Sequence, residues 1–135
     1  MREATNYNQT IIDTFRANGG KVSGWNNLLL LTTTGARTGL PRTTPLAYSV
    51  DGGRIVVAAS KGGAPTNPAW YANILANPTV TVELGSETFQ ARATVVDEAE
   101  RQRLYAGHAE LMPGFADYEK KTTRRIPVII LERLN

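Results

Sequence analysis

Apolar residues recur every three or four positions in the opening segment of the chain. Ile11, Ile12 and Phe15 fall on one face of a helix predicted over Asn6 to Asn18, and the glycines that follow end it. A helix with a single apolar face usually packs on a protein core, and the same face would also suit contact with a membrane surface. Residues 1–20 are therefore predicted to form an amphipathic helix and a turn.

From Trp25 the pattern changes to short apolar runs and alternation. The runs LLLLTTT, RTTPLAYSV and RIVVAAS, separated by turns at GARTGLP and DGG, predict a β-meander. Two more strands are predicted at Thr79 to Leu84 and at Thr88 to Val96, and a last one lies in the tail IPVIILERL.

Short helices are predicted between these strands. Asn67 to Asn77 opens with an Asn cap followed by Pro68, and Asp97 caps a helix that Pro113 and Gly114 end. A short helical piece, FADYEKKTT, then leads into the last strand. About six strands thus alternate with three or four helices, and most connections are too short for crossover helices. The pattern predicts a mainly β (α+β) fold, a small antiparallel barrel with peripheral helices.

Length and composition narrow the class of protein. The 135 residues fit one domain, so residues 1–135 are predicted to form a single domain. The absence of cysteine excludes thiol catalysis and thiolate metal sites, and no metal site is expected. The net charge of +3 favours anionic ligands without indicating nucleic acid. With no apolar run long enough to span a bilayer, a soluble, cytoplasmic protein is predicted.

Two arginines frame the first candidate site, Thr32 to Pro45. Arg37 and Arg42 lie five residues apart among glycines and threonines, and a hairpin would bring both to one end of the barrel. Guanidinium groups pair with phosphate through two hydrogen bonds, so the segment suits an anion cradle. The alternative is an ordinary exposed loop with solvated arginines.

Small residues mark the second candidate, Ala58 to Pro65. A planar ring can lie against such a backbone, with Ser60 as a hydrogen-bond donor and Lys61 as a positive charge. The alternative is a simple glycine turn with a solvated lysine. Nearby, on the same short helix as Tyr71, the Trp70 indole could cover a cofactor and Asn73 could bind a carbonyl or phosphate of it. Core packing is the commoner fate of Trp70 or Tyr71 individually.

The single histidine argues against hydrolysis. His108 lies in a charged helix without a second histidine or a carboxylate pair near it, so we expect an exposed helix residue. Hydride transfer from a bound cofactor needs few catalytic side chains and fits the chain better.

Three stretches, LLLLTTTGARTGLPRTTPL, RIVVAASKGGAPTNPAWYANILANP and FADYEKKTTRRIPVIIL, resemble the deazaflavin-dependent nitroreductase family of actinobacteria. The resemblance implies a split antiparallel β-barrel, a single deazaflavin-binding domain, and reduced coenzyme F-420 (8-hydroxy-5-deazaflavin) as cofactor, with flavin mononucleotide as the alternative. It also implies hydride transfer to a quinone-like or other flat aromatic acceptor. A non-catalytic deazaflavin-binding protein remains a further alternative. Because menaquinone resides in membranes, a further expectation is peripheral contact with the membrane through the N-terminal helix.

The resemblance assigns cofactor contacts to four short segments. Contacts to the phosphate and the anionic tail fall on Ala36, Arg37, Thr38 and Arg42. Contacts to the ring and ribityl chain fall on Thr43, Thr44, Pro45 and Leu46, on Ala58, Ala59, Ser60 and Lys61, and on Ala69, Trp70, Tyr71 and Asn73.

The resemblance places the acceptor against the tail helix. Relatives that reduce nitroimidazoles carry tyrosines at three positions spaced by three, where this chain has Met112, Phe115 and Tyr118. Phe115 has no hydroxyl, which disfavours nitroimidazole activation, whereas an apolar wall suits a flat prenylated quinone. Ser60 and Tyr118 are the candidate catalytic proton donors.

Overall fold

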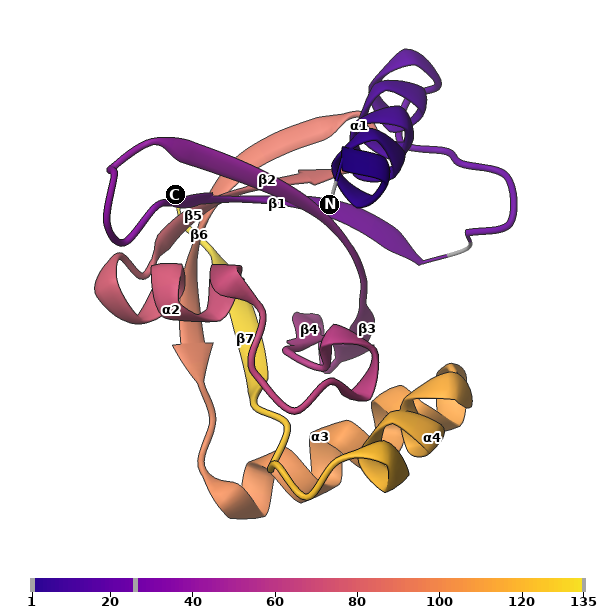
Figure 1. Ribbon diagram of the computed structural model, residues 1–135, viewed down its shortest axis with the longest axis vertical. Helices are drawn as coiled ribbons and strands as arrows, with labels where there is room; N and C mark the ends of the chain where they lie inside the picture. The colour runs from indigo at the N-terminus through magenta and orange to yellow at the C-terminus, as the bar shows by residue number, and fades with distance from the viewer. Residues whose placement is uncertain (1, 26, 135) are drawn as a thin grey trace.

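A single curled antiparallel sheet organises the molecule, in a computed structural model that describes residues 2–25 and 27–134. Within these residues seven strands pair in the order β2-β1-β5-β6-β7-β4-β3 (Figure 1). They are β1 Leu28–Thr34, β2 Pro41–Ala47, β3 Ser49–Asp51, β4 Arg54–Ala58, β5 Thr79–Leu84, β6 Glu87–Val95 and β7 Val128–Arg133. The predicted mainly β, antiparallel architecture is confirmed.

The sheet has one strand more than the six expected, because the predicted run from Arg42 to Val50 is interrupted at Tyr48. The Tyr48 backbone N–H donates to the Asn27 carbonyl at 3.0 Å, in register with the β1–β2 pairing and just beyond its last pair, Leu28 with Ala47. The strands on either side of Tyr48, β2 and β3, lie at opposite edges of the sheet. The chain therefore passes from one edge to the other through a single residue, which curls the sheet toward a barrel (Figure 1).

The run of four leucines in β1 is buried on both faces of the sheet. Leu29 and Leu31 point into the core inside the curl, whereas Leu28 and Leu30 pack against Ile11, Ile12 and Phe15. Those three side chains belong to the N-terminal helix α1, Arg2–Ala17. The alternation of strand side chains explains the division. The helix predicted near the N-terminus is confirmed, and its apolar face packs on the sheet.

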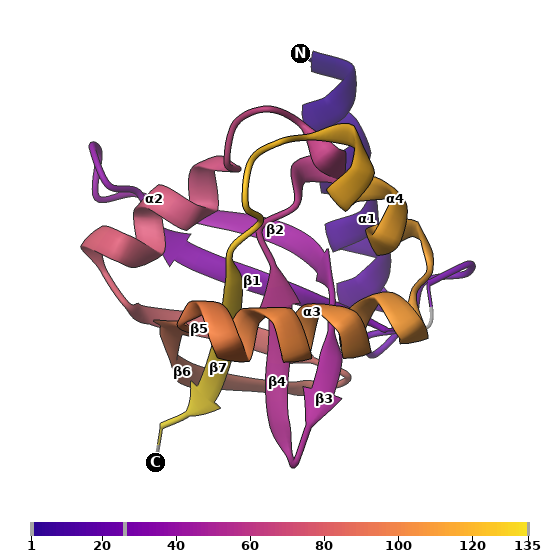
Figure 2. The ribbon, with the colours of Figure 1, turned by 90° about the horizontal axis from the view of Figure 1, so that it is seen from below.

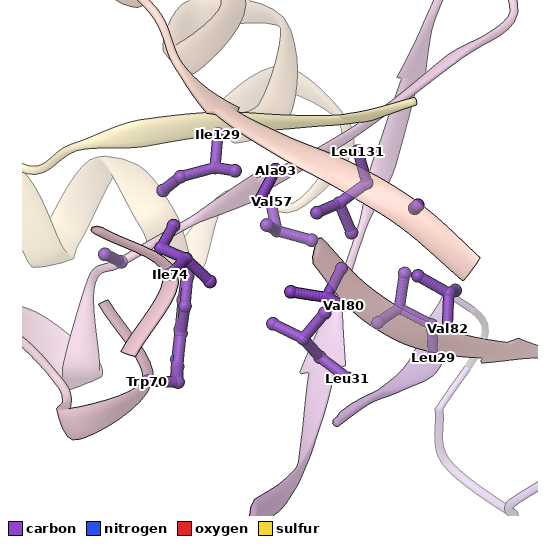
Figure 3. Close-up of a cluster of buried hydrophobic side chains, with 12 residues drawn as sticks. Leu29, Leu31, Val57, Trp70, Ile74, Val80, Val82, Ala93, Ile129 and Leu131 are labelled. Atoms are coloured by element: carbon purple, nitrogen blue, oxygen red, sulfur yellow. The ribbon is translucent and has the colours of Figure 1, made fainter. Parts of the chain in front are cut away.

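The main core fills the inside of the curled sheet (Figure 3). Val57, Val80 and Ile129 meet there from three strands. Helix α2, Ala69–Ala76, adds Trp70 and Ile74 to the same cluster. The prediction that Trp70 packs in the core is confirmed, since this residue is 5% exposed.

Two further helices cover the outer face of β4 and β7. Helix α3, Glu98–Leu111, lies across these strands (Figure 2), and α4, Gly114–Lys121, follows it. Asp97 caps α3 as predicted, because its carboxylate accepts from the Glu100 N–H at 3.0 Å. The predicted cap of α2 is wrong: Pro68 occupies that position, and the Asn67 side chain binds Arg124 instead.

Candidate functional site

The β1–β2 hairpin brings the two candidate arginines to one cleft. The strands pair with Thr33 opposite Arg42, so the connecting loop carries Arg37 at the end of the sheet next to α2. A cleft of about 890 Å³ opens there between α1, this loop, β2 and the first turn of α2. Nine predicted cofactor residues line it: Ala36, Arg37, Thr38, Arg42, Thr43, Thr44, Ala69, Trp70 and Asn73.

The charge of the cleft is positive and unopposed. Arg37 and Arg42 are exposed, and neither guanidinium has a carboxylate or hydrogen-bond partner within the part of the chain that the structure describes. A third arginine of the lining, Arg16, is bound by both carboxylate oxygens of Glu83 at 2.9 and 2.8 Å. No acidic residue is among the described residues of the lining. Two free guanidinium groups can therefore hold a phosphate or a carboxylate.

Glycines give the loop its shape. The Gly35 N–H donates to the Leu40 carbonyl at 2.8 Å, and the Gly39 N–H donates to the Gly35 carbonyl at 2.9 Å. Gly39 has a φ of +70°, and a Cβ on Gly35 would lie 2.8 Å from Thr38 Oγ1. The turn thus favours glycine at 39 for its conformation, and a side chain at 35 would displace the Thr38 hydroxyl.

Asn73 anchors the hairpin of β1 and β2 through two hydrogen bonds. Its side chain is 7% exposed, its Oδ1 accepts from the Ala36 N–H at 2.9 Å, and its Nδ2 donates to Thr33 Oγ1 at 3.0 Å. Both ends of the amide are therefore engaged within the protein. In this arrangement Asn73 anchors the loop that carries Arg37.

The second predicted segment lies outside the walls of this cleft. Ala58, Ala59 and Ser60 are buried, and Ala59 belongs to the main core. Lys61 is exposed and begins η1, a 3-10 turn over Lys61–Gly63. Three other predicted contacts, Pro45, Leu46 and Tyr71, are half-buried and also lie outside the lining.

The candidate acceptor residues lie on α4 and the turn before it, and α4 packs against η1. A Cβ on Gly63 would lie 2.9 Å from the Tyr118 carbonyl oxygen, which shows how closely the two segments approach. Tyr118 and Met112 are half-buried. The structure therefore brings the second motif and the acceptor candidates together, apart from the arginine-lined cleft.

Phe115 anchors α4 to α3. Its ring lies edge to face with His108, Tyr105 and Tyr118 at centroid distances of 4.3, 6.3 and 5.1 Å. The Tyr105 hydroxyl also donates to the Phe115 carbonyl at 2.6 Å. Phe115 thus contributes to packing between two helices.

The expectation that His108 is exposed is wrong. The side chain is 1% exposed, shares a 2.7 Å hydrogen bond between Nδ1 and Ser49 Oγ, and leaves Nε2 without a partner among the described residues. Burial lowers the pKa of His108 to about 4. The helical spacing could have predicted this burial, because His108 lies four residues after Leu104 and three after Tyr105, both of which are buried.

Sequence reasoning missed Arg124. Its guanidinium binds backbone and side-chain oxygens between Ala59 and Asn67, residues that lie 57 to 65 positions earlier in the chain. The tail motif contains this arginine, but nothing in the local pattern indicates a partner so distant.

Among the described residues that line the cleft there is no histidine, cysteine, serine or carboxylate. Its described lining offers cations, hydroxyl groups, amides and an indole, which together can bind and cover an anionic cofactor. Such a site supports reactions in which the cofactor supplies the chemistry.

The chain is similar to known proteins in both sequence and fold. A family model described as "F-420H(2)-dependent quinone reductase" matches residues 7–133. An F-420H(2)-dependent quinone reductase of Mycobacterium tuberculosis is 40% identical over 118 residues, which cover 85% of this chain and 79% of that protein.

Two solved structures share the fold and much of the sequence. A structure of an F-420-H2 dependent reductase (FDR-A) aligns with a TM-score of 0.73 and 38% identity, covering 84% of this chain and all of the other. A structure described as a domain-swapped dimer aligns with a TM-score of 0.74 and 36% identity, covering 97% and 96%. The split-barrel form of the predicted fold is confirmed by the first of these matches.

Proposed function

Because the chain belongs to the F-420H(2)-dependent quinone reductase family, we propose that it binds reduced coenzyme F-420 in the arginine-lined cleft and reduces a quinone-like acceptor. The observation that carries the proposal is the pair of guanidinium groups at one end of the sheet, Arg37 and Arg42, which have no partner among the described residues. The cofactor assignment follows the family, which does not favour the flavin mononucleotide alternative. Residues 1–135 are proposed to act as one cofactor-binding domain.

Arg37 and Arg42 are the proposed ligands of the phosphate and the anionic tail. Each can present two N–H groups to one anion. The Thr38 hydroxyl accepts from the Leu40 N–H at 3.2 Å and keeps its own hydrogen for a ligand oxygen. The Ala36 N–H is already bound to Asn73, so Ala36 contributes backbone shape to the site.

The ring is proposed to lie along β2 and the first turn of α2. Thr43, Thr44 and Ala69 line the cleft directly, and Trp70 forms its floor from the core side. Pro45, Leu46 and Tyr71 continue the same surface as half-buried neighbours. Lys61, with Ala58, Ala59 and Ser60 behind it, is proposed to approach the ring from η1.

When bound, the reduced deazaflavin supplies a hydride to the acceptor. This chain supplies binding, exclusion of water and a proton. We propose that Met112, Phe115 and Tyr118 form the acceptor wall, with the Tyr118 or Ser60 hydroxyl as proton donor. The Phe115 ring also packs edge to face on His108 of α3, and we propose that quinone reduction does not need a hydroxyl at this position.

Anaerobic mixing of the protein with reduced coenzyme F-420 and menadione tests the activity. We expect oxidation of the cofactor that depends on both protein and menadione. The change in the long-wavelength absorbance of the cofactor measures this oxidation. Reaction with a nitroimidazole is expected to be much slower. Tight binding of the cofactor without turnover across a panel of quinones and nitroaromatics would instead show a non-catalytic binding protein.

Replacing Arg42 by alanine is expected to weaken binding of the cofactor by about 1 to 3 kcal/mol, the value of a charge-assisted hydrogen bond. Fluorescence quenching at low and high salt measures the affinity, and the loss should shrink as salt screens the anionic tail. Arg92→Ala is the matched control, because Arg92 is an exposed arginine on β6 outside the cleft. Equal affinities for Arg42→Ala and the unaltered protein at low salt would show that the Arg42 side chain is only solvated and does not bind the cofactor.

We further propose that the protein works in the cytoplasm and meets membrane quinones only peripherally. No described helix is long and apolar enough to cross a bilayer. Ile11, Ile12 and Phe15 are buried against the sheet, so a membrane contact through α1 would use its polar face or require the helix to undock. Co-sedimentation with vesicles of anionic lipid measures this contact.

A further inference from the structure

The segment that leads from β4 to α2 is wrapped around the side chain of Arg124. Five hydrogen bonds of 2.6 to 3.1 Å run from its guanidinium to the carbonyls of Ala59, Ser60 and Ala64, the last of them twice, and to Asn67 Oδ1. A guanidinium has five N–H donors, so every donor of this side chain is used. Figure 2 shows the chain before β7 running beside this segment.

A strained residue lies at the centre of the wrapped segment. Lys61 has a φ of +48°, a conformation that a lysine rarely adopts. Such a residue persists only where its surroundings fix the backbone on both sides. Arg124 provides this restraint, because it binds the Ser60 carbonyl before Lys61 and the Ala64 carbonyl after it.

Neither cation of this region is neutralised within the part of the chain that the structure describes. Arg124 has no carboxylate within ion-pair distance, and Lys61 Nζ reaches only the neutral Thr66 hydroxyl, at 3.3 Å, among those residues. By contrast, the neighbouring Arg125 pairs with Glu98 at 3.3 Å and is 69% exposed. The strained lysine is therefore presented to solvent above a second, partly buried positive charge.

The same segment supports α4. Gly63 follows Lys61 by two residues, has a φ of +81°, and approaches the Tyr118 backbone so closely that a Cβ would meet its carbonyl oxygen at 2.9 Å. Any shift of the segment would thus also move the surface on which Tyr118 rests. The Arg124 guanidinium therefore holds the backbone at Lys61 and, through the same segment, the surface against which α4 packs.

We propose that Arg124 is a positioning residue of the reductase: it holds Lys61 in its strained conformation so that the ammonium meets an anionic group of the cofactor. The inference rests on the proposed function and adds to it a residue outside the cleft. Arg124 touches neither cofactor nor acceptor in this proposal. It acts through the backbone of Ser60 to Ala64.

The test compares Arg124→Lys with Arg125→Lys, two substitutions that keep the charge at adjacent positions. A lysine has three donors on one atom and cannot reach the four acceptors that the guanidinium fork binds. We expect Arg124→Lys to raise the Kd of coenzyme F-420 about tenfold, and its KM more than it lowers kcat, as misplacement of a binding group does. Arg125→Lys should stay within about twofold of the unaltered protein, as a change at an exposed ion pair does.

Amide hydrogen exchange separates local loosening from a general loss of stability. Gly63 and Ala64 donate to Ser60 and Lys61 at 3.0 and 3.1 Å, and these two amides should lose protection in Arg124→Lys while the strands keep theirs. If Arg124→Lys does not fold, the unaltered protein still gives a test, because cofactor binding should raise protection at the same two amides. Unchanged protection on binding would overturn the inference.

Two results separate the inference from the proposed function. Binding of coenzyme F-420 by the unaltered protein, together with an equal affinity in folded Arg124→Lys, would overturn the positioning role alone. No binding by the unaltered protein would contradict the proposed function, and the inference with it.

Discussion

Replacing Asn73 by alanine is expected to lower the free energy of unfolding by about 2 to 4 kcal/mol, among the largest effects of any single polar substitution in this chain. The buried amide accepts from the Ala36 N–H and donates to Thr33 Oγ1, so its removal breaks two hydrogen bonds and leaves a space beside the core. Urea unfolding followed by circular dichroism measures the change.

The same substitution should weaken cofactor binding in the protein that remains folded. Without the Asn73 amide, the loop between β1 and β2 loses its attachment to α2, and Arg37 loses its fixed position at the cleft. Asn77→Ala is the matched control, because Asn77 ends the same helix with an exposed side chain. A loss below about 1 kcal/mol would indicate that water replaces the amide at both partners.

Acidification from pH 7 to pH 5 is expected to cost about 2 kcal/mol of stability through His108 alone. The unfolded histidine takes up a proton near pH 6.5, whereas burial lowers the pKa of His108 in the folded protein to about 4. The unfolded state therefore binds more protons between these values, and stability falls by roughly 1.4 kcal/mol for each pH unit in that window. Well above pH 6.5 the histidine is neutral in both the folded and the unfolded state, and it no longer lowers the stability.

The chain suits this measurement because His108 is its single histidine. Two carboxylates of the ion pairs titrate lower: hydrogen bonds from Arg103 and Arg54 lower the pKa of Asp51 to about 2, and those from Arg101 and Gln102 lower the pKa of Glu98. His108→Asn keeps an amide where Nδ1 meets Ser49 and should show a nearly flat profile from pH 7 to pH 5. Parallel profiles for the two proteins would contradict the assignment.

Local patterns in the sequence predicted the elements of the fold well. Strand β5, the helix at the N-terminus and the Asp97 cap agree with the structure, because alternation, helical spacing and a capping carboxylate all act within a few residues. The pairing of β1 with β2 likewise follows from a short turn. The Asn67 cap failed because a distant guanidinium binds that side chain.

The candidate site was predictable where its parts lie close together in the sequence. Arg37 and Arg42 meet at the cleft because one hairpin carries both. Lys61 was recognised as a cation, but its strained backbone and its dependence on Arg124 result from contacts across nearly half of the chain. Local composition carries no information about such contacts.

The passage of the chain through Tyr48 has a consequence for how the protein unfolds. In an open sheet each outer strand can detach alone, at a free energy well below that of global unfolding. Here the two outer strands, β2 and β3, are consecutive in sequence and separated by one residue, so detaching either one pulls directly on the other. We therefore expect β2 and β3 to detach together with the rest of the sheet, in a single cooperative unfolding transition, and neither strand to detach earlier.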